Sequence, residues 1–113
     1  MGVDLALYPL DEAWSSGQKS FTGNTRLDLN RRKDFFARIE NVLKPAPVPL
    51  TVTIFLFDKE EVSKDCYNEP LTFVLAGELK KLDFSDFTDE RNKAALAYIG
   101  CLSDNIPIIL WWY

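Results

Sequence analysis

The segment IPIILWWY, residues 106–113, is an uninterrupted run of apolar and aromatic residues and gives the strongest constraint on the fold. Every side chain in it is apolar or aromatic, so an extended chain here presents apolar groups on both of its faces. Strands of this kind occur where other layers cover both sides of a sheet. We therefore expect residues 106–113 to form a strand packed on both faces, and a terminus this apolar is not expected to dangle.

Two other segments also predict strands. Residues 2–10, GVDLALYPL, alternate apolar and polar positions, which indicates a half-buried strand that ends at Pro9. Residues 50–57, LTVTIFLF, are β-branched and aromatic, and from Ile54 onward they are apolar on both faces. That second pattern predicts a central strand.

The remaining non-helical segments give weaker patterns. Residues 71–82 fit either a strand (71–75) followed by a short helix (76–82) or a single helix, and the β-branched and aromatic residues at 72–74 favour the first. Residues 11–25 are rich in Gly, Ser, Asn and Thr and predict a loop, as does the acidic segment 58–70.

Two helices are predicted from the spacing of apolar residues. The first begins at the N-cap Asn30 and ends near Lys44, before the prolines of KPAPVP. The second begins at the N-cap Thr88 and runs to about Ser103. Their expected buried stripes are Phe35, Phe36, Ile39, Val42 and Leu43 in the first, and Ala94, Ala95, Tyr98, Ile99, Cys101 and Leu102 in the second.

These elements predict an α/β or α+β fold. We expect residues 1–113 to form one compact domain, with a mixed sheet of about four strands and two main helices packed on it. Burial scaling supports an independent core, because a chain of this size buries roughly two-thirds of its unfolded surface.

The composition excludes several functions. The chain contains no histidine, which removes the Ser-His-Asp and Cys-His nucleophile systems and most catalytic zinc sites. The net charge of -4 argues against direct nucleic-acid binding. With two cysteines, no signal-peptide pattern and no membrane-spanning apolar run, a cytoplasmic location is the simplest expectation.

Cofactor and metal motifs are not found either. The GQKS at residues 17–20 departs from a P-loop, because Gln18 separates the Gly from the Lys and Glu12 stands where the first Gly should be. The acidic run at residues 83–90 lacks the alternate carboxylates and the glycine of a calcium loop. We therefore predict no cofactor, no metal and no enzymatic activity, although a carboxylate-based hydrolase stays an open alternative.

The leading interpretation is a small interaction module that binds a protein partner, as an inhibitor or regulator of a larger protein. Its candidate contacts are loop aromatics and acidic residues that could meet a basic surface. They are Trp14, Phe21 and Tyr67, with Asp58, Glu60 and Glu61. The alternative for Trp14, which its sequence context favours slightly, is that it folds back over the sheet, and a homodimer is a further alternative.

The second interpretation is a pocket for a small anionic ligand such as a phosphate or a nucleotide. Arg32 and Arg91 fall in the predicted first turns of the two helices, where a cation opposes the helix dipole. If the two helices lie parallel, their N-termini meet at one end of the sheet, and Lys19 and Arg26 could complete an anion site. The competing interpretation pairs each arginine with a nearby acid.

Overall fold

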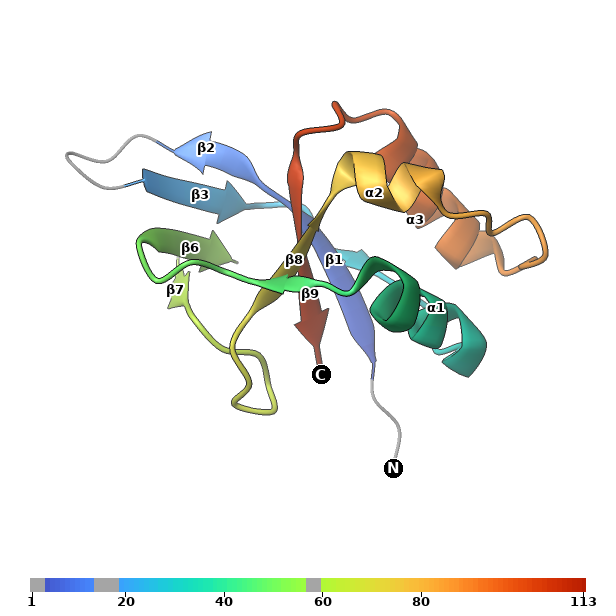
Figure 1. Cartoon of the computed structure of the whole chain (residues 1–113), viewed down its shortest axis with the longest axis horizontal. Coiled ribbons are helices and arrows are strands. Elements are labelled where there is room, and N and C mark those ends of the chain that lie inside the picture. Colours follow the sequence, from blue (N-terminus) through green and yellow to red (C-terminus); the bar gives the residue numbers. More distant parts are fainter. Residues whose placement is uncertain (1–3, 14–18, 57–59) are drawn as a thin grey trace.

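The computed structural model describes residues 4–13, 19–56 and 60–113, and these residues form nine strands and three helices (Figure 1). The strands are β1 (Leu5–Pro9), β2 (Asp11–Ala13), β3 (Lys19–Gly23), β4 (Leu27–Asp28), β5 (Ala46–Pro47), β6 (Val52–Leu56), β7 (Glu60–Val62), β8 (Thr72–Leu75) and β9 (Pro107–Trp112). The helices are α1 (Lys33–Leu43), α2 (Ala76–Lys81) and α3 (Glu90–Gly100). None of these helices is long and apolar enough to cross a bilayer.

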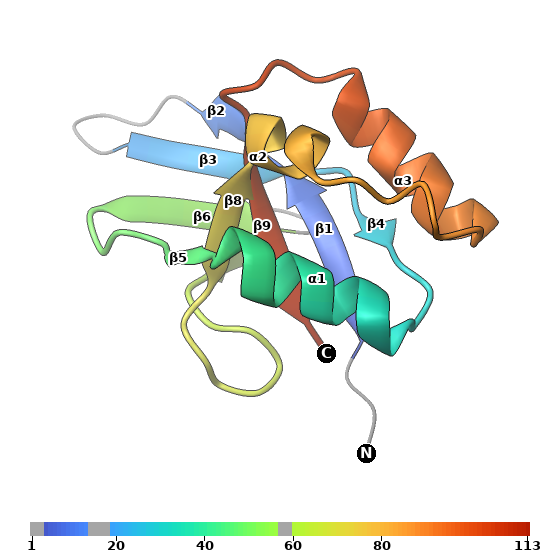
Figure 2. The same ribbon diagram turned by 45° about the vertical axis from the view of Figure 1, so that its right-hand side comes forward.

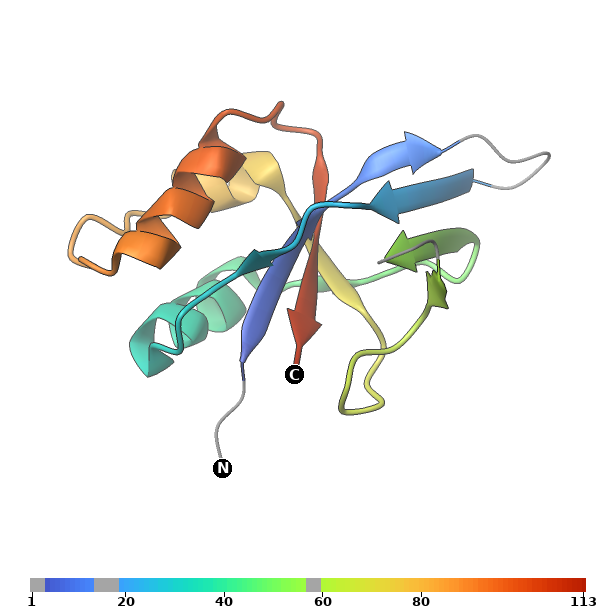
Figure 3. The same cartoon turned by 180° about the vertical axis from the view of Figure 1, so that it is seen from behind.

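The strands form two sheets rather than one. A five-stranded antiparallel sheet has the order β4-β1-β9-β8-β5, and a four-stranded sheet has the order β2-β3-β6-β7 with β3 and β6 parallel. The three helices cover one face of the larger sheet and the smaller sheet lies on the other side, as the front and back views show (Figures 1 and 3). The predicted compact α+β class is confirmed, with a second sheet added.

The strand β9 is covered on both faces, as predicted, and it occupies the centre of the larger sheet. It pairs with β1 on one side and β8 on the other, so that Leu110 lies between Leu7 and Thr72. Ile108 and Leu110 point into the core beneath the helices, whereas Ile109 points into the core between the two sheets. All three are fully buried, because each face of the strand has its own covering layer.

The strand β1 is more deeply buried than its alternating sequence suggests. All five of its residues are buried, so the prediction of a half-buried strand was wrong. Leu5 and Leu7 contact the helical core, and Ala6 and Tyr8 contact the core between the sheets. The tyrosine counts as polar in a binary pattern, although its ring packs like an apolar group.

The prediction of a loop at residues 11–25 was wrong, because this segment contains the strands β2 and β3. Phe21 pairs in register with Ile54, which places β3 alongside the predicted central strand β6. This segment is too poor in apolar residues for a period-two pattern. The strand β3 forms beside β6, and β2 in turn pairs with β3. In contrast, the strand at 71–75 and the helix at 76–82 are confirmed as β8 and α2.

Both long helices begin later than predicted. The N-cap of α1 is Arg32 rather than Asn30, and the N-cap of α3 is Asp89 rather than Thr88. Asp89 caps α3 while it also accepts hydrogen bonds from Asn30, whereas the Arg32 side chain makes no capping hydrogen bond in α1. The helix α3 ends at Gly100, before the predicted Ser103.

The buried faces predicted for the two long helices include residues that are in fact exposed. Val42 is 60% exposed and Tyr98 is 43% exposed, and Ala94 and Cys101 are also exposed. The face that α3 buries carries Asn92, Ala95 and Ile99, because α3 contacts its neighbours along one narrow line.

Candidate functional site

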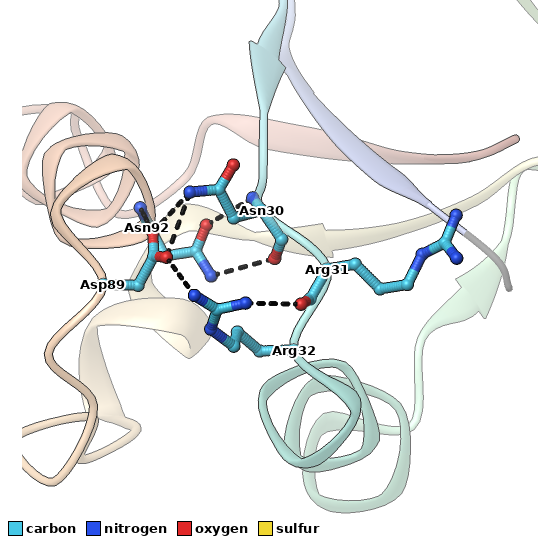
Figure 4. A network of polar contacts seen from close by, with 5 residues as sticks. All are labelled: Asn30, Arg31, Arg32, Asp89 and Asn92. Carbon is cyan, nitrogen blue, oxygen red and sulfur yellow. Dashed lines mark hydrogen bonds and ion pairs between the residues drawn. The ribbon is translucent and has the colours of Figure 1, made fainter.

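The starts of α1 and α3 meet at one corner of the molecule, which is the arrangement that the anion-pocket interpretation requires. Asn30 joins them: its backbone N–H donates to Oδ1 of Asn92 at 2.7 Å, and its carbonyl accepts from Nδ2 of Asn92 at 3.2 Å. Its side-chain amide donates to both carboxylate oxygens of Asp89 at 3.0 Å (Figure 4). Asn92 is 1% exposed, so this corner is a buried polar junction between the helices.

Asp89 already supplies the negative charge at this corner. Its carboxylate accepts from the backbone N–H of Asn92 at 3.0 Å and pairs with Nη2 of Arg32 at 3.1 Å. The hydrogen bonds from Asn30 and from the Asn92 backbone lower the pKa of the Asp89 carboxyl, and the positive charge of Arg32 lowers it further. An internal carboxylate thus takes the position at which an external anion would bind.

The four residues predicted to bind an anion come from different parts of the fold. Arg32 is an exposed N-cap residue that pairs with Asp89, not a core-facing residue of the first turn. Arg91 is exposed, and it makes no ion pair with any residue that the structure describes. Lys19 begins β3 in the smaller sheet, and its side chain lies outside the described atoms. Anion binding by these residues stays a prediction.

The fourth of them, Arg26, belongs to a separate polar cluster. Its Nε atom donates to Asp28 at 2.6 Å, and its guanidinium lies 4.6 Å from the centre of the Tyr113 ring. The Tyr113 hydroxyl donates to the same carboxylate at 2.9 Å, and a weaker contact of 3.4 Å joins Arg26 to the Tyr8 hydroxyl. Burial raises the pKa of Tyr8 to about 12. This cluster ties β4 to β1 and to the end of the chain.

Part of the acidic run at residues 83–90 is bound internally by Arg38. Arg38 pairs with Asp86 through two bonds of 2.9 and 3.1 Å, and it donates to the carbonyl of Asp83 at 2.7 Å. Glu61 is exposed on β7, whereas Asp58 and the side chain of Glu60 lie outside the described residues.

The predicted partner-contacting aromatics divide into three cases. Phe21 is half-buried on β3 and packs against the core between the sheets, so it is not a loop residue. Trp14 lies outside the described residues. Tyr67 is 43% exposed and lies on a surface turn, where it lines a concave feature of the surface.

This feature is an open groove of about 1170 Å³, which we call the α1 groove. Most of its lining residues come from α1 and from the turn at residues 63–71, two segments whose ribbons can be followed in Figure 2. Its apolar lining comes from Phe36, Trp112, Tyr67 and three prolines at positions 45, 47 and 70. The ring of Phe36 meets that of Trp112 edge-to-face at 5.9 Å. The charged residues that line it are Arg31, Lys33, Glu40, Lys44, Asp65 and Glu69.

The turn that carries Tyr67 is held by its own hydrogen bonds. Oδ1 of Asp65 accepts from the backbone N–H of Tyr67 at 2.8 Å and from that of Glu69 at 3.2 Å. Asn68 adopts the left-handed conformation that such a turn requires, with φ 62°. The N–H of Cys66 also donates to the carbonyl of Trp112 at 3.3 Å. Tyr67 is therefore presented on a backbone that is already ordered.

Sequence reasoning found Tyr67 but missed the groove. Trp112 was assigned to the core, and nothing in the sequence places α1 next to residues 63–71. The available signal was turn chemistry, since Asp65 and Asn68 are spaced as in an Asx-supported turn.

Comparison with known proteins identifies no relatives: the chain matches no protein-family model, no curated protein and no solved structure. Within the described residues, no three His, Cys, Asp or Glu side chains lie together as metal ligands would.

Proposed function

We propose that this chain is a small, non-enzymatic protein-binding module and that a partner protein contacts it in the α1 groove. The observation that carries the proposal is an open, aromatic-lined groove beside an exposed tyrosine on an ordered turn. Tyr, Trp and Arg dominate the energetics of protein interfaces, and pre-ordered anchors lose little entropy on binding. A role as an inhibitor or regulator of a larger protein is consistent with such a module.

The size of the groove favours a polypeptide over a small anion. Pockets that enclose a small ligand typically measure about 300–1,000 Å³ and bury most of the ligand. The α1 groove exceeds that volume and is open to solvent. At the helix N-termini, Asp89 and Arg32 already pair with each other, which makes an anion-binding function less favourable there.

Site-specific photo-crosslinking tests the proposal because it captures a partner whose identity is still open. A photoreactive phenylalanine analogue is placed at Tyr67 and, as a matched control, at Tyr98, because both tyrosines are 43% exposed and only Tyr67 lines the groove. In the cells that express the protein, we expect one discrete protein adduct from position 67 that position 98 does not give.

The captured protein is then purified and its affinity measured directly. Tyr67→Ala is expected to weaken binding by about tenfold or more, as for interface hot spots, while Tyr98→Ala leaves it unchanged. Identical adducts from the two positions, or none from position 67, would contradict the proposal.

A further inference from the structure

We infer that the α1 groove receives an extended, proline-containing segment of the partner that carries at least one basic residue. This inference rests on the proposed function and specifies the chemistry of the partner. It follows from the length of the groove, from the edge strand beside it and from the charges along its walls.

The length of the groove suits a short extended segment. Its helical wall runs along the whole of α1, from Lys33 to Lys44. At 1.5 Å per residue, this 11-residue helix is about 16 Å long. An extended or polyproline chain advances about 3.1–3.3 Å per residue, so roughly five residues would fill the groove.

The edge strand β5 cannot accept an added β-strand. The N–H of Val48 donates inward to the carbonyl of Leu71 at 3.0 Å. Because N–H groups alternate sides along a strand, position 47 of β5 faces outward and is a proline, and the positions that flank the strand at 45 and 49 are also prolines. The free edge therefore offers no backbone donor, and a segment in the groove must be recognised through side chains.

Aromatic grooves that bind through side chains commonly hold polyproline helices, which need no backbone ladder and lose little entropy on binding. Tyr67 supplies a ring on an ordered turn, and Phe36 fixes the ring of Trp112. These rings line the same groove, where they could pack against proline rings of the segment.

The charges favour a basic residue in the segment. The turn contributes Asp65 and Glu69 to one wall, and the middle of the helical wall contributes Glu40. Neither glutamate forms an ion pair with another described residue, whereas the cation Arg31 is already held by Asp4 at 2.8 Å. Lys33 and Lys44 stand at the two ends of the helical wall, and the carboxylate of Glu40 lies between them in the sequence, so a cation of the segment would be favoured near Glu40.

The test is a selection from a display library of random nine-residue peptides, with the intact protein as bait and Tyr67→Ala for counter-selection. We expect the enriched peptides to share proline and at least one Arg or Lys. Synthetic peptides should lose about tenfold in affinity with Tyr67→Ala and severalfold with the charge reversal Glu69→Lys, but not with Tyr98→Ala.

Two results would overturn the inference: enriched peptides that lack proline or are acidic, or a selection that yields no peptide dependent on Tyr67. In either case, a specific crosslink from position 67 to an intact protein would leave the proposed function standing. Loss of both the crosslink and the peptides would remove the proposed function as well.

Discussion

Replacing Asn92 by alanine would test whether the buried junction between the helices stabilises the fold. The Asn92 side chain is 1% exposed and makes two hydrogen bonds to the backbone of Asn30, one to its N–H and one to its carbonyl. No other hydrogen bond in the described structure serves either of these two backbone groups. Truncation to alanine therefore leaves a donor and an acceptor without partners.

The cost follows from these two groups. Each buried polar group left unsatisfied costs about 1–3 kcal/mol, and Asn30 is only half-buried, so water offsets part of the penalty. We expect the free energy of unfolding to fall by about 2–4 kcal/mol, a large share of a typical total of about 5–15 kcal/mol. With a urea m-value of about 2 kcal/mol/M, the midpoint should fall by about 1–2 M.

The assay is urea unfolding followed by circular dichroism and by tryptophan fluorescence. The matched control is Asn41→Ala, which makes the same chemical change at an exposed position of α1 and should change stability by less than about 0.5 kcal/mol. If Asn92→Ala lost less than about 1 kcal/mol with an unchanged m-value, the junction would not be a significant source of stability.

Three further predictions concern backbone space and titration. Gly23→Ala should destabilise the fold by about 1–3 kcal/mol, because its new Cβ would lie 2.6 Å from Cδ2 of the buried Leu56. Gly100→Ala should stabilise the fold by about 0.5–1 kcal/mol, because this position of α3 has open space around it. Thermal unfolding measures both changes. The pKa of Asp89 is lowered in the fold, so its contribution to stability is present above the ordinary carboxyl pKa and lost as pH falls below it. Asp89→Asn should therefore reduce the loss of unfolding free energy as the pH falls below the ordinary carboxyl pKa. An unchanged dependence of the unfolding free energy on pH in this range would contradict the prediction. For Tyr8, burial raises the pKa to about 12, so stability should be lost as pH rises from about 10 to 12, and Tyr8→Phe should remove one late tyrosinate from an absorbance titration.

Much of the central layer could be predicted from the sequence, because it depends on local pattern. The apolar character of both faces of residues 106–113 correctly indicates that β9 is a strand covered on both sides. The change from β-branched residues to helix formers near residue 76 likewise locates the boundary between β8 and α2.

The sequence-based predictions are wrong where contacts with residues distant in the sequence determine the local structure. Thr88 and Asp89 are both good N-cap residues, and Asp89 is selected because Asn30 and Arg32 reach it from another part of the chain. The strands β2 and β3 exist because β6 supplies a neighbour, which no window of residues 11–25 reveals. The α1 groove also joins segments that are remote in sequence, so only its individual residues could be anticipated.

The pairing of β1 with β9 has a consequence for how the protein is made. Leu5 lies opposite Trp112, so the first strand in the chain forms its longest ladder with the last one. On the ribosome, β1 therefore emerges long before its main neighbour has been translated, with five residues that only the finished fold buries. Both cores include residues of β9, so neither can close until residues 107–112 pair with β1, and pairing between segments this far apart in the sequence slows folding.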